Sequence, residues 1–168
     1  AAFSRVPVAL IGALGVGKEW LARAIHAAQF GAAGRFLVVD CRAVPVDVLR
    51  QELLADRPAA KGARGVLREP GDGTLLLKGP LQLPQDLQSE LTQRFRDPAH
   101  GWRLMLSERT PLEAGLADGR LLESFYYLST GLIAAVPSLH ERKEDLEDLC
   151  SMVDRKSTRL NSSHTVIS

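Results

Sequence analysis

The sequence predicts an α/β fold built on a mostly parallel sheet of five strands. Two observations support this prediction. Short apolar runs alternate with longer segments of helical periodicity, and a glycine-rich turn joins the first such run to the first such segment. Strands that alternate with helices form βαβ units, whose right-handed crossovers place helices on both faces of the sheet. We therefore expect three layers.

The elements can be assigned in order along the chain. Val6 to Ile11 is apolar and ends at a glycine, as a buried strand does. Glu19 to Gln29 carries apolar residues at helical spacing. The pattern predicts further strands over 36–39, 74–77, 103–106 and 132–136, and further helices over 46–54, 85–96, 121–128 and 144–153. Residues 57–65 contain a proline and two glycines and are expected to form a loop.

Composition excludes several classes of protein. Of 168 residues, 45% are hydrophobic and 24% are charged, which excludes disordered, collagen-like and disulfide-scaffold chains. No apolar run approaches the roughly 18 residues that a membrane span needs. No secretory signal is visible at the start, and Cys41 and Cys150 have no metal-ligand spacing. We expect a cytoplasmic protein with reduced thiols and no metal site.

The two ends of the chain differ from its body. Residues 155–168 add Arg155, Lys156 and Arg159 without an acid, so a net charge of +1 for the whole chain leaves residues 1–154 at −2. A weakly acidic body is not expected to bind nucleic acid by charge. The last residues are rich in Ser, Thr and Asn and resemble translated vector sequence. We expect one domain over 1–154 and a non-native or disordered tail over 155–168; a natural polar tail is the alternative.

The turn between the first strand and the first helix fits the phosphate-loop pattern G-x-x-x-x-G-K. Its glycines would let backbone N–H groups approach phosphate oxygens, and Lys18 would contact the β- and γ-phosphates. Glu19 stands where the general pattern has the Ser or Thr that binds Mg²⁺. An ordinary glycine-rich turn is the alternative. The predicted nucleotide-binding residues are Gly12, Ala13, Leu14, Gly15, Val16, Gly17, Lys18 and Glu19.

Motifs along most of the chain resemble the AAA+ domain of bacterial sigma-54-dependent transcriptional activators. The loop resembles GESGTGKE, so Glu19 is normal for that family. Residues 21–26 resemble VARAIH, residues 36–45 resemble FVAVNCAALP, residues 72–77 resemble GGTLFL, and residues 139–146 resemble LRERREDI. The resemblance runs from about Val6 to Leu149 and implies a P-loop AAA+ core, ATP as ligand and a ring of subunits. The helical lid and the DNA-binding domain of the family would lie beyond this chain.

The chain departs from the family at the residues that hydrolyse ATP. GGTLFL is followed in the family by an Asp that binds Mg²⁺ and a Glu that polarises water, but here by Lys78 and Gly79. Two arginines that reach the neighbouring subunit's ATP fall on Leu122 and Leu128. The resemblance therefore implies a degenerate copy that binds ATP, with Mg²⁺ dependence in question and with no catalytic residue. It also leaves open whether a homo- or hetero-oligomeric ring forms.

Three further family elements are altered. The GAFTGA loop that contacts sigma-54 corresponds to LADRPAAKGARG at residues 54–65, which lacks a Phe-Thr pair. The sensor strand ends in Ser107, Glu108 and Arg109 in place of ATN, and the switch asparagine is Asp40. We therefore expect no productive contact with sigma-54 polymerase.

Two other interpretations stay open. A working ATPase could use a substitute acid, for which Asp72, Asp86 and Glu108 are the candidates; Glu108 fits best because it ends an adjacent strand. A nucleotide-free scaffold or gene fragment is the other, since a glycine-rich loop can persist without its ligand.

Overall fold

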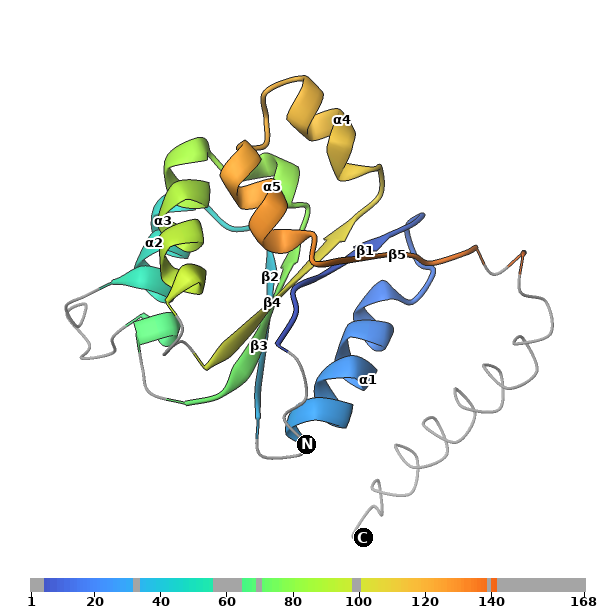
Figure 1. The fold of residues 1–168 in the computed structure, drawn as a ribbon, viewed down its shortest axis with the longest axis horizontal. Coiled ribbons are helices and arrows are strands. Elements are labelled where there is room, and N and C mark those ends of the chain that lie inside the picture. The colour runs from blue at the N-terminus through green and yellow to red at the C-terminus, as the bar shows by residue number, and fades with distance from the viewer. Residues whose placement is uncertain are drawn as a thin grey trace, which may run out of the picture. The chain divides into compact units, whose positions relative to one another are not determined.

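The computed structural model describes residues 5–31, 34–55, 65–68, 71–97, 101–138 and 140–141. A five-stranded sheet with the strand order β2-β3-β4-β1-β5 lies at its centre, and every pairing is parallel (Figure 1). This confirms the predicted mostly parallel α/β sheet. The strands are β1 (Val8–Ile11), β2 (Arg35–Asp40), β3 (Gly73–Lys78), β4 (Trp102–Glu108) and β5 (Leu132–Ala135).

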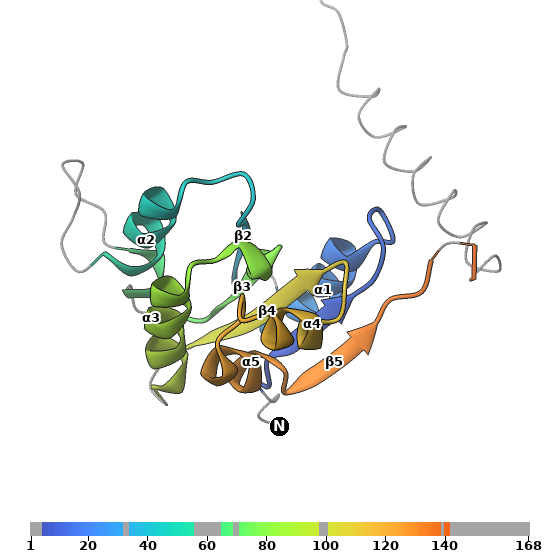
Figure 2. The ribbon, with the colours of Figure 1, turned by 90° about the horizontal axis from the view of Figure 1, so that it is seen from above.

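Helices cover both faces of this sheet. Helix α1 lies on one face, and α2, α3 and α5 lie on the other (Figures 1 and 2). The helices are α1 (Lys18–Phe30), α2 (Val46–Leu54), α3 (Gln85–Arg96), α4 (Leu112–Ala117) and α5 (Glu123–Ser129). Short 3-10 helices span Val66–Arg68 and Pro80–Gln82. The helices predicted over 46–54 and 85–96 are confirmed at both ends, whereas α4 was not predicted.

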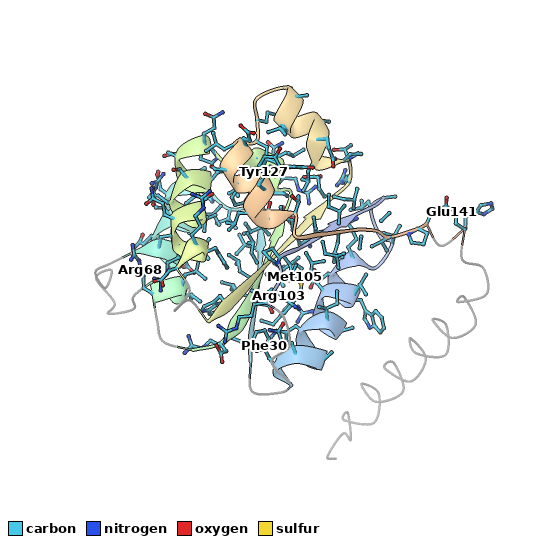
Figure 3. The ribbon with its side chains drawn as sticks, in the orientation of Figure 1. Phe30, Arg68, Arg103, Met105, Tyr127 and Glu141 are labelled. Carbon is cyan, nitrogen blue, oxygen red and sulfur yellow. The ribbon has the colours of Figure 1, made fainter. Side chains whose placement is uncertain are left out.

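Alternating residues of the central strands supply the two cores. In β3, Leu75 and Leu77 face the cluster beneath α2, α3 and α5, while Leu76 joins the smaller cluster beneath α1. Met105 of β4 is fully buried on the α1 side (Figure 3). The core is almost entirely aliphatic, and strands buried on both faces read as continuous apolar runs.

Strand register brings the functional loops to one edge of the sheet. Ile11 of β1 lies beside Glu108 of β4, Ser107 lies beside Lys78 of β3, and Lys78 lies beside Asp40 of β2. Because all these strands are parallel, their carboxyl ends meet at the same edge. In open α/β sheets, this edge is where ligands bind.

His26 ties α1 to β3. Its Nδ1 lies 2.8 Å from Thr74 Oγ1 and its Nε2 lies 3.3 Å from the carbonyl oxygen of Gly34. The carbonyl can only accept, so Nε2 carries the proton and Nδ1 accepts from the Thr74 hydroxyl. Burial against Phe30 and Phe36 lowers the pKa of His26, which favours the neutral ring in the folded state.

This neutral histidine predicts a loss of stability in mild acid. In the unfolded chain, His26 binds a proton near its ordinary pKa of 6.5. In the folded chain the pKa of His26 is lower, so the proton binds only at lower pH. The contribution of neutral His26 to the stability of the fold is therefore fully present above pH 6.5 and is lost as the pH falls below that value. We expect the free energy of unfolding, measured with urea, to fall more between about pH 7.5 and about pH 5 for the wild type than for His26→Gln. Equal declines would contradict this assignment.

The chain divides into two compact units, residues 1–136 and 137–168. Among the described residues of the second unit, the carboxylate of Glu141 accepts hydrogen bonds from the backbone N–H (2.7 Å) and hydroxyl (2.8 Å) of Ser138. The predicted helix over 144–153 and the predicted tail over 155–168 lie outside the described residues. Within the part of the chain that the structure describes, no helix is both long and apolar enough to cross a membrane.

Candidate functional site

The predicted phosphate loop connects β1 to α1, as its motif requires. Gly15 and Gly17 have φ angles of 80° and 88°, in the left-handed region that glycine adopts without strain. Gly17 is also the N-cap of α1, and no side chain caps this helix terminus. An uncapped helix N-terminus offers N–H groups and a favourable dipole to an anion.

A cavity of about 260 Å³ opens beside this loop. Several elements contribute to its wall: the loop, the start of α1, and residues at or just beyond the ends of β2, β3 and β4. The lining residues are Leu14, Gly15, Gly17, Lys18, Glu19, Arg42, Lys78, Ser107, Glu108 and Arg109. Five of the eight predicted loop residues therefore line the cavity, whereas Gly12, Ala13 and Val16 do not.

Lys18 folds back onto its own loop. Its Nζ donates to the carbonyl oxygens of Gly12 and Ala13, each at 2.6 Å. Burial lowers the pKa of Lys18, and the nearby charge of Arg109 lowers it further, while Glu108 opposes the shift. Arg42 and Lys78 also disfavour the charged form, so an anion bound close to Lys18 would relieve this repulsion.

Glu19 and Lys78 form an ion pair across the cavity wall. Lys78 Nζ donates to Glu19 Oε2 at 3.3 Å, and Arg23 donates to the other carboxylate oxygen at 3.0 Å. The hydrogen bond from Arg23, with that from Lys78, lowers the pKa of Glu19 against the opposing effect of burial. Glu19 is therefore an ionised carboxylate with both oxygens engaged.

Arg42 and Arg109 add two cations that were not predicted as site residues. Arg42 donates from Nε and from its backbone N–H to Asp40 Oδ1, both at 3.1 Å. Burial alone would raise the pKa of Asp40, but these hydrogen bonds lower it overall. Arg109 is exposed and follows β4, and its guanidinium makes no ion pair with any residue that the structure describes. Their position just beyond parallel strand ends was the signal that could have identified them.

The residues at this edge do not fit a magnesium ion. Mg²⁺ takes oxygen ligands in a near-octahedral arrangement. Here the Lys78 ammonium occupies the end of β3, and Glu19 is bound by two cations. Within the described ranges, no group of three or more His, Cys, Asp or Glu residues could hold a metal ion.

Comparison with known proteins identifies the family. The family described as Sigma-54 interaction domain matches residues 1–99. The chain belongs to this family. Its parallel sheet and phosphate loop are those of the P-loop AAA+ proteins among its structural neighbours, so the expected fold class is confirmed.

Relatives of this sigma-54 interaction domain are bacterial transcriptional regulators. The acetoin catabolism regulatory protein of Cupriavidus necator is 32% identical over 161 residues, covering 84% of this chain and 24% of the relative. The hydrogenase regulator HoxA of the same species is 32% identical over 164 residues, covering 87% and 34%. AtoC of Escherichia coli is 29% identical over 166 residues, covering 89% and 36%. The chain thus spans a quarter to a third of these relatives.

Several solved structures share the fold of this chain. NtrX from Brucella abortus in complex with ADP has a TM-score of 0.75 at 25% identity, covering 90% of this chain and 36% of that one. Its complex with ATP has a TM-score of 0.72 at the same identity and covers 90% and 37%. The P-loop NTPase domain of an Escherichia coli sigma-54 activator has a TM-score of 0.60 at 27% identity, covering 82% and 87%.

The two leucines that the resemblance aligns with the family's arginines pack against the core. Leu122 is the N-cap of α5 and Leu128 lies within this helix. Both side chains are partly buried against the core beneath α3 and α5. The backbone N–H of Leu122 also donates to Gln88 Oε1 at 2.8 Å.

The structure separates the three candidate substitute acids. Asp72 precedes β3 and pairs with Arg5 at 2.8 Å, and Asp86 lies on α3 and pairs with Arg50 at 2.5 Å. Neither lines the cavity. Glu108 does, and its carboxylate accepts the backbone N–H of Arg109 at 2.7 Å.

Two other residues can be placed. Burial raises the pKa of the Cys41 thiol to about 12, and this cysteine is free. Trp20 is exposed on α1 and does not line the cavity. Most of the segment that replaces GAFTGA, residues 56–64, and Cys150 lie outside the described residues.

Proposed function

We propose that this chain is the ATP-binding domain of a sigma-54-activator-like bacterial transcriptional regulator, and that it does not hydrolyse ATP. The observation that carries the proposal is the ion pair between Glu19 and Lys78 beside the phosphate loop. By the resemblance, Lys78 stands where the family has a metal-binding carboxylate, and Gly79 supplies no side chain to polarise water. Phosphoryl transfer needs both functions.

Three observations support nucleotide binding. The loop glycines adopt left-handed conformations, α1 begins uncapped, and Lys18 lies at the cavity. The related NtrX is described in complex with ADP and with ATP. The proposed binding residues remain those of the loop, 12–19, joined by Arg42 and Arg109.

The regulatory role would then rest on binding rather than turnover. A nucleotide-bound domain can alter assembly or the contacts of a longer protein without remodelling sigma-54 polymerase. We propose a homo- or hetero-oligomer as the functional state, in which an active paralogue could supply the missing charges. Contact with DNA would come from another domain.

A titration of the chain with fluorescent ATP tests the binding proposal. We expect saturable binding that Lys18→Ala weakens about ten- to hundredfold, because a hydrogen bond from a charged group is worth about 1.5–3 kcal/mol. Arg96→Ala is the matched control, since Arg96 is exposed at the end of α3 and does not line the cavity. Circular dichroism would verify that both variants fold.

Absence of binding in the folded wild type would overturn the proposal. The chain would then be a nucleotide-free scaffold or a gene fragment that keeps the fold. Binding that Lys18→Ala leaves unchanged would place the nucleotide elsewhere.

A further inference from the structure

Cations outnumber acids in the wall of the cavity. Lys18, Arg42, Lys78 and Arg109 face two carboxylates, Glu19 and Glu108. We infer that this site selects the metal-free, fully ionised form of a polyphosphate, and that Mg²⁺ in solution weakens binding. The inference rests on the proposed function, because it concerns the same site.

The four cations come from separate parts of the fold. Lys18 begins α1, Arg42 follows β2, Lys78 ends β3 and Arg109 follows β4. Strand register holds them at one edge, where Lys78 lies beside Ser107 and Asp40. They also interact electrostatically: Arg109, Arg42 and Lys78 all disfavour the charged form of Lys18. An arrangement of like charges that repel one another is relieved by an anion and worsened by a metal ion.

Lys78 can turn to a phosphate without leaving Glu19 unpaired. Its contact with Glu19 is long, at 3.3 Å, while Arg23 holds the other oxygen of that carboxylate at 3.0 Å. Arg23 lies one helical turn after Glu19 on the same face of α1. Glu19 therefore keeps a counter-ion when Lys78 exchanges its partner.

Magnesium changes the charge that the site encounters. A polyphosphate that carries Mg²⁺ has two fewer negative charges, and its metal ion would approach Lys78. Charges a few ångströms apart near a protein surface interact strongly enough to alter a binding constant well beyond tenfold. Two of the four cations have acidic partners, Lys78 with Glu19 and Arg42 with Asp40, which moderates the effect. We expect a preference of about tenfold for the metal-free ligand.

Calorimetric titration of the full chain with ATP and with inorganic tripolyphosphate tests this inference. Each ligand is measured in EDTA and in excess Mg²⁺ at matched ionic strength. Both should bind about tenfold more tightly in EDTA. Lys78→Asp should weaken binding in EDTA and reverse the order for ATP, whereas Lys78→Met should abolish most of the preference without reversing it.

Arg96→Asp makes the same change in net charge as Lys78→Asp, outside the cavity. It should keep the wild-type preference, and loss of the preference in this variant would show a general charge effect and overturn the inference. Binding that is equal or tighter with Mg²⁺ would also overturn it, while leaving the proposed nucleotide binding intact. No binding of either ligand under either condition would instead reject the proposed function.

Discussion

The purified protein should release phosphate from ATP no faster than a buffer control. An arginine finger alone contributes about 10³–10⁵ in rate to phosphoryl transfer, and under the proposed function its two positions are the leucines that lie partly buried against the core. Under the proposed function, β3 would have to present a metal-binding acid, but it ends in Lys78, which is paired with Glu19. A phosphate-release assay over hours, at saturating ATP with Mg²⁺, would detect even weak turnover.

Two variants identify the source of any activity. Turnover that Lys18→Ala abolishes would refute the proposed lack of hydrolysis. Turnover that Glu108→Gln also abolishes would identify Glu108 as the substitute acid, since it alone of the three candidate acids lines the cavity. Activity that survives both substitutions would indicate a contaminating enzyme.

The site also resists simple restoration of its acids. Gly79 has a φ of 68°, which favours glycine, and a Cβ at this position would lie 2.8 Å from Arg42 Nε. A glutamate there would require Arg42 to move away from Asp40. We therefore expect the double variant Lys78→Asp, Gly79→Glu to remain inactive in the same assay.

Replacing Phe125 with alanine should destabilise the fold more than any other single truncation discussed above. Phe125 is fully buried and is among the largest fully buried side chains of the described residues. It fixes α5 against the core that also holds Leu87 and Leu91 of α3. Truncation of a buried phenylalanine costs about 3–5 kcal/mol, through lost transfer free energy and the cavity left behind.

Urea unfolding would measure the free energy of unfolding lost in Phe125→Ala. A second residue of α5 serves as the control. Tyr127 lies two residues further along the same helix with 67% of its surface exposed (Figure 3). Tyr127→Ala should change the free energy of unfolding by no more than about 0.5 kcal/mol. Similar losses for both variants would mean that α5 is held by its own helicity rather than by its buried face.

Much of the fold could be predicted because its signals are local. The run from Leu75 to Leu77 is apolar throughout, as a strand covered on both faces must be, and α3 carries Leu87 and Leu91 at helical spacing. Helix α4 was not predicted because it has six residues and contains a glycine; Pro111 is its N-cap, one residue before the first helical position, where proline signals a helix start. No longer periodic pattern distinguishes this helix from a loop in the sequence.

The candidate site was only half predictable. Residues 12–19 form a contiguous motif, so their role can be inferred without a fold. Arg42 and Arg109 lie in segments compared with family motifs, but the motifs assign neither of them a ligand; they reach the cavity because parallel strands end at the same edge. The partner of Lys78 likewise depends on where α1 lies relative to β3, which no spacing in the sequence specifies.

The contact of Lys18 with two carbonyl oxygens makes phosphate capture an exchange of hydrogen bonds rather than a simple gain. An arriving anion must compete with Gly12 and Ala13 for the protons of the ammonium group. The measured heat of association would then report the difference between two sets of bonds. For the same reason, the affinity lost in Lys18→Ala combines a missing ligand contact with a loosened loop, and it should not be equated with the strength of the lysine–phosphate bond.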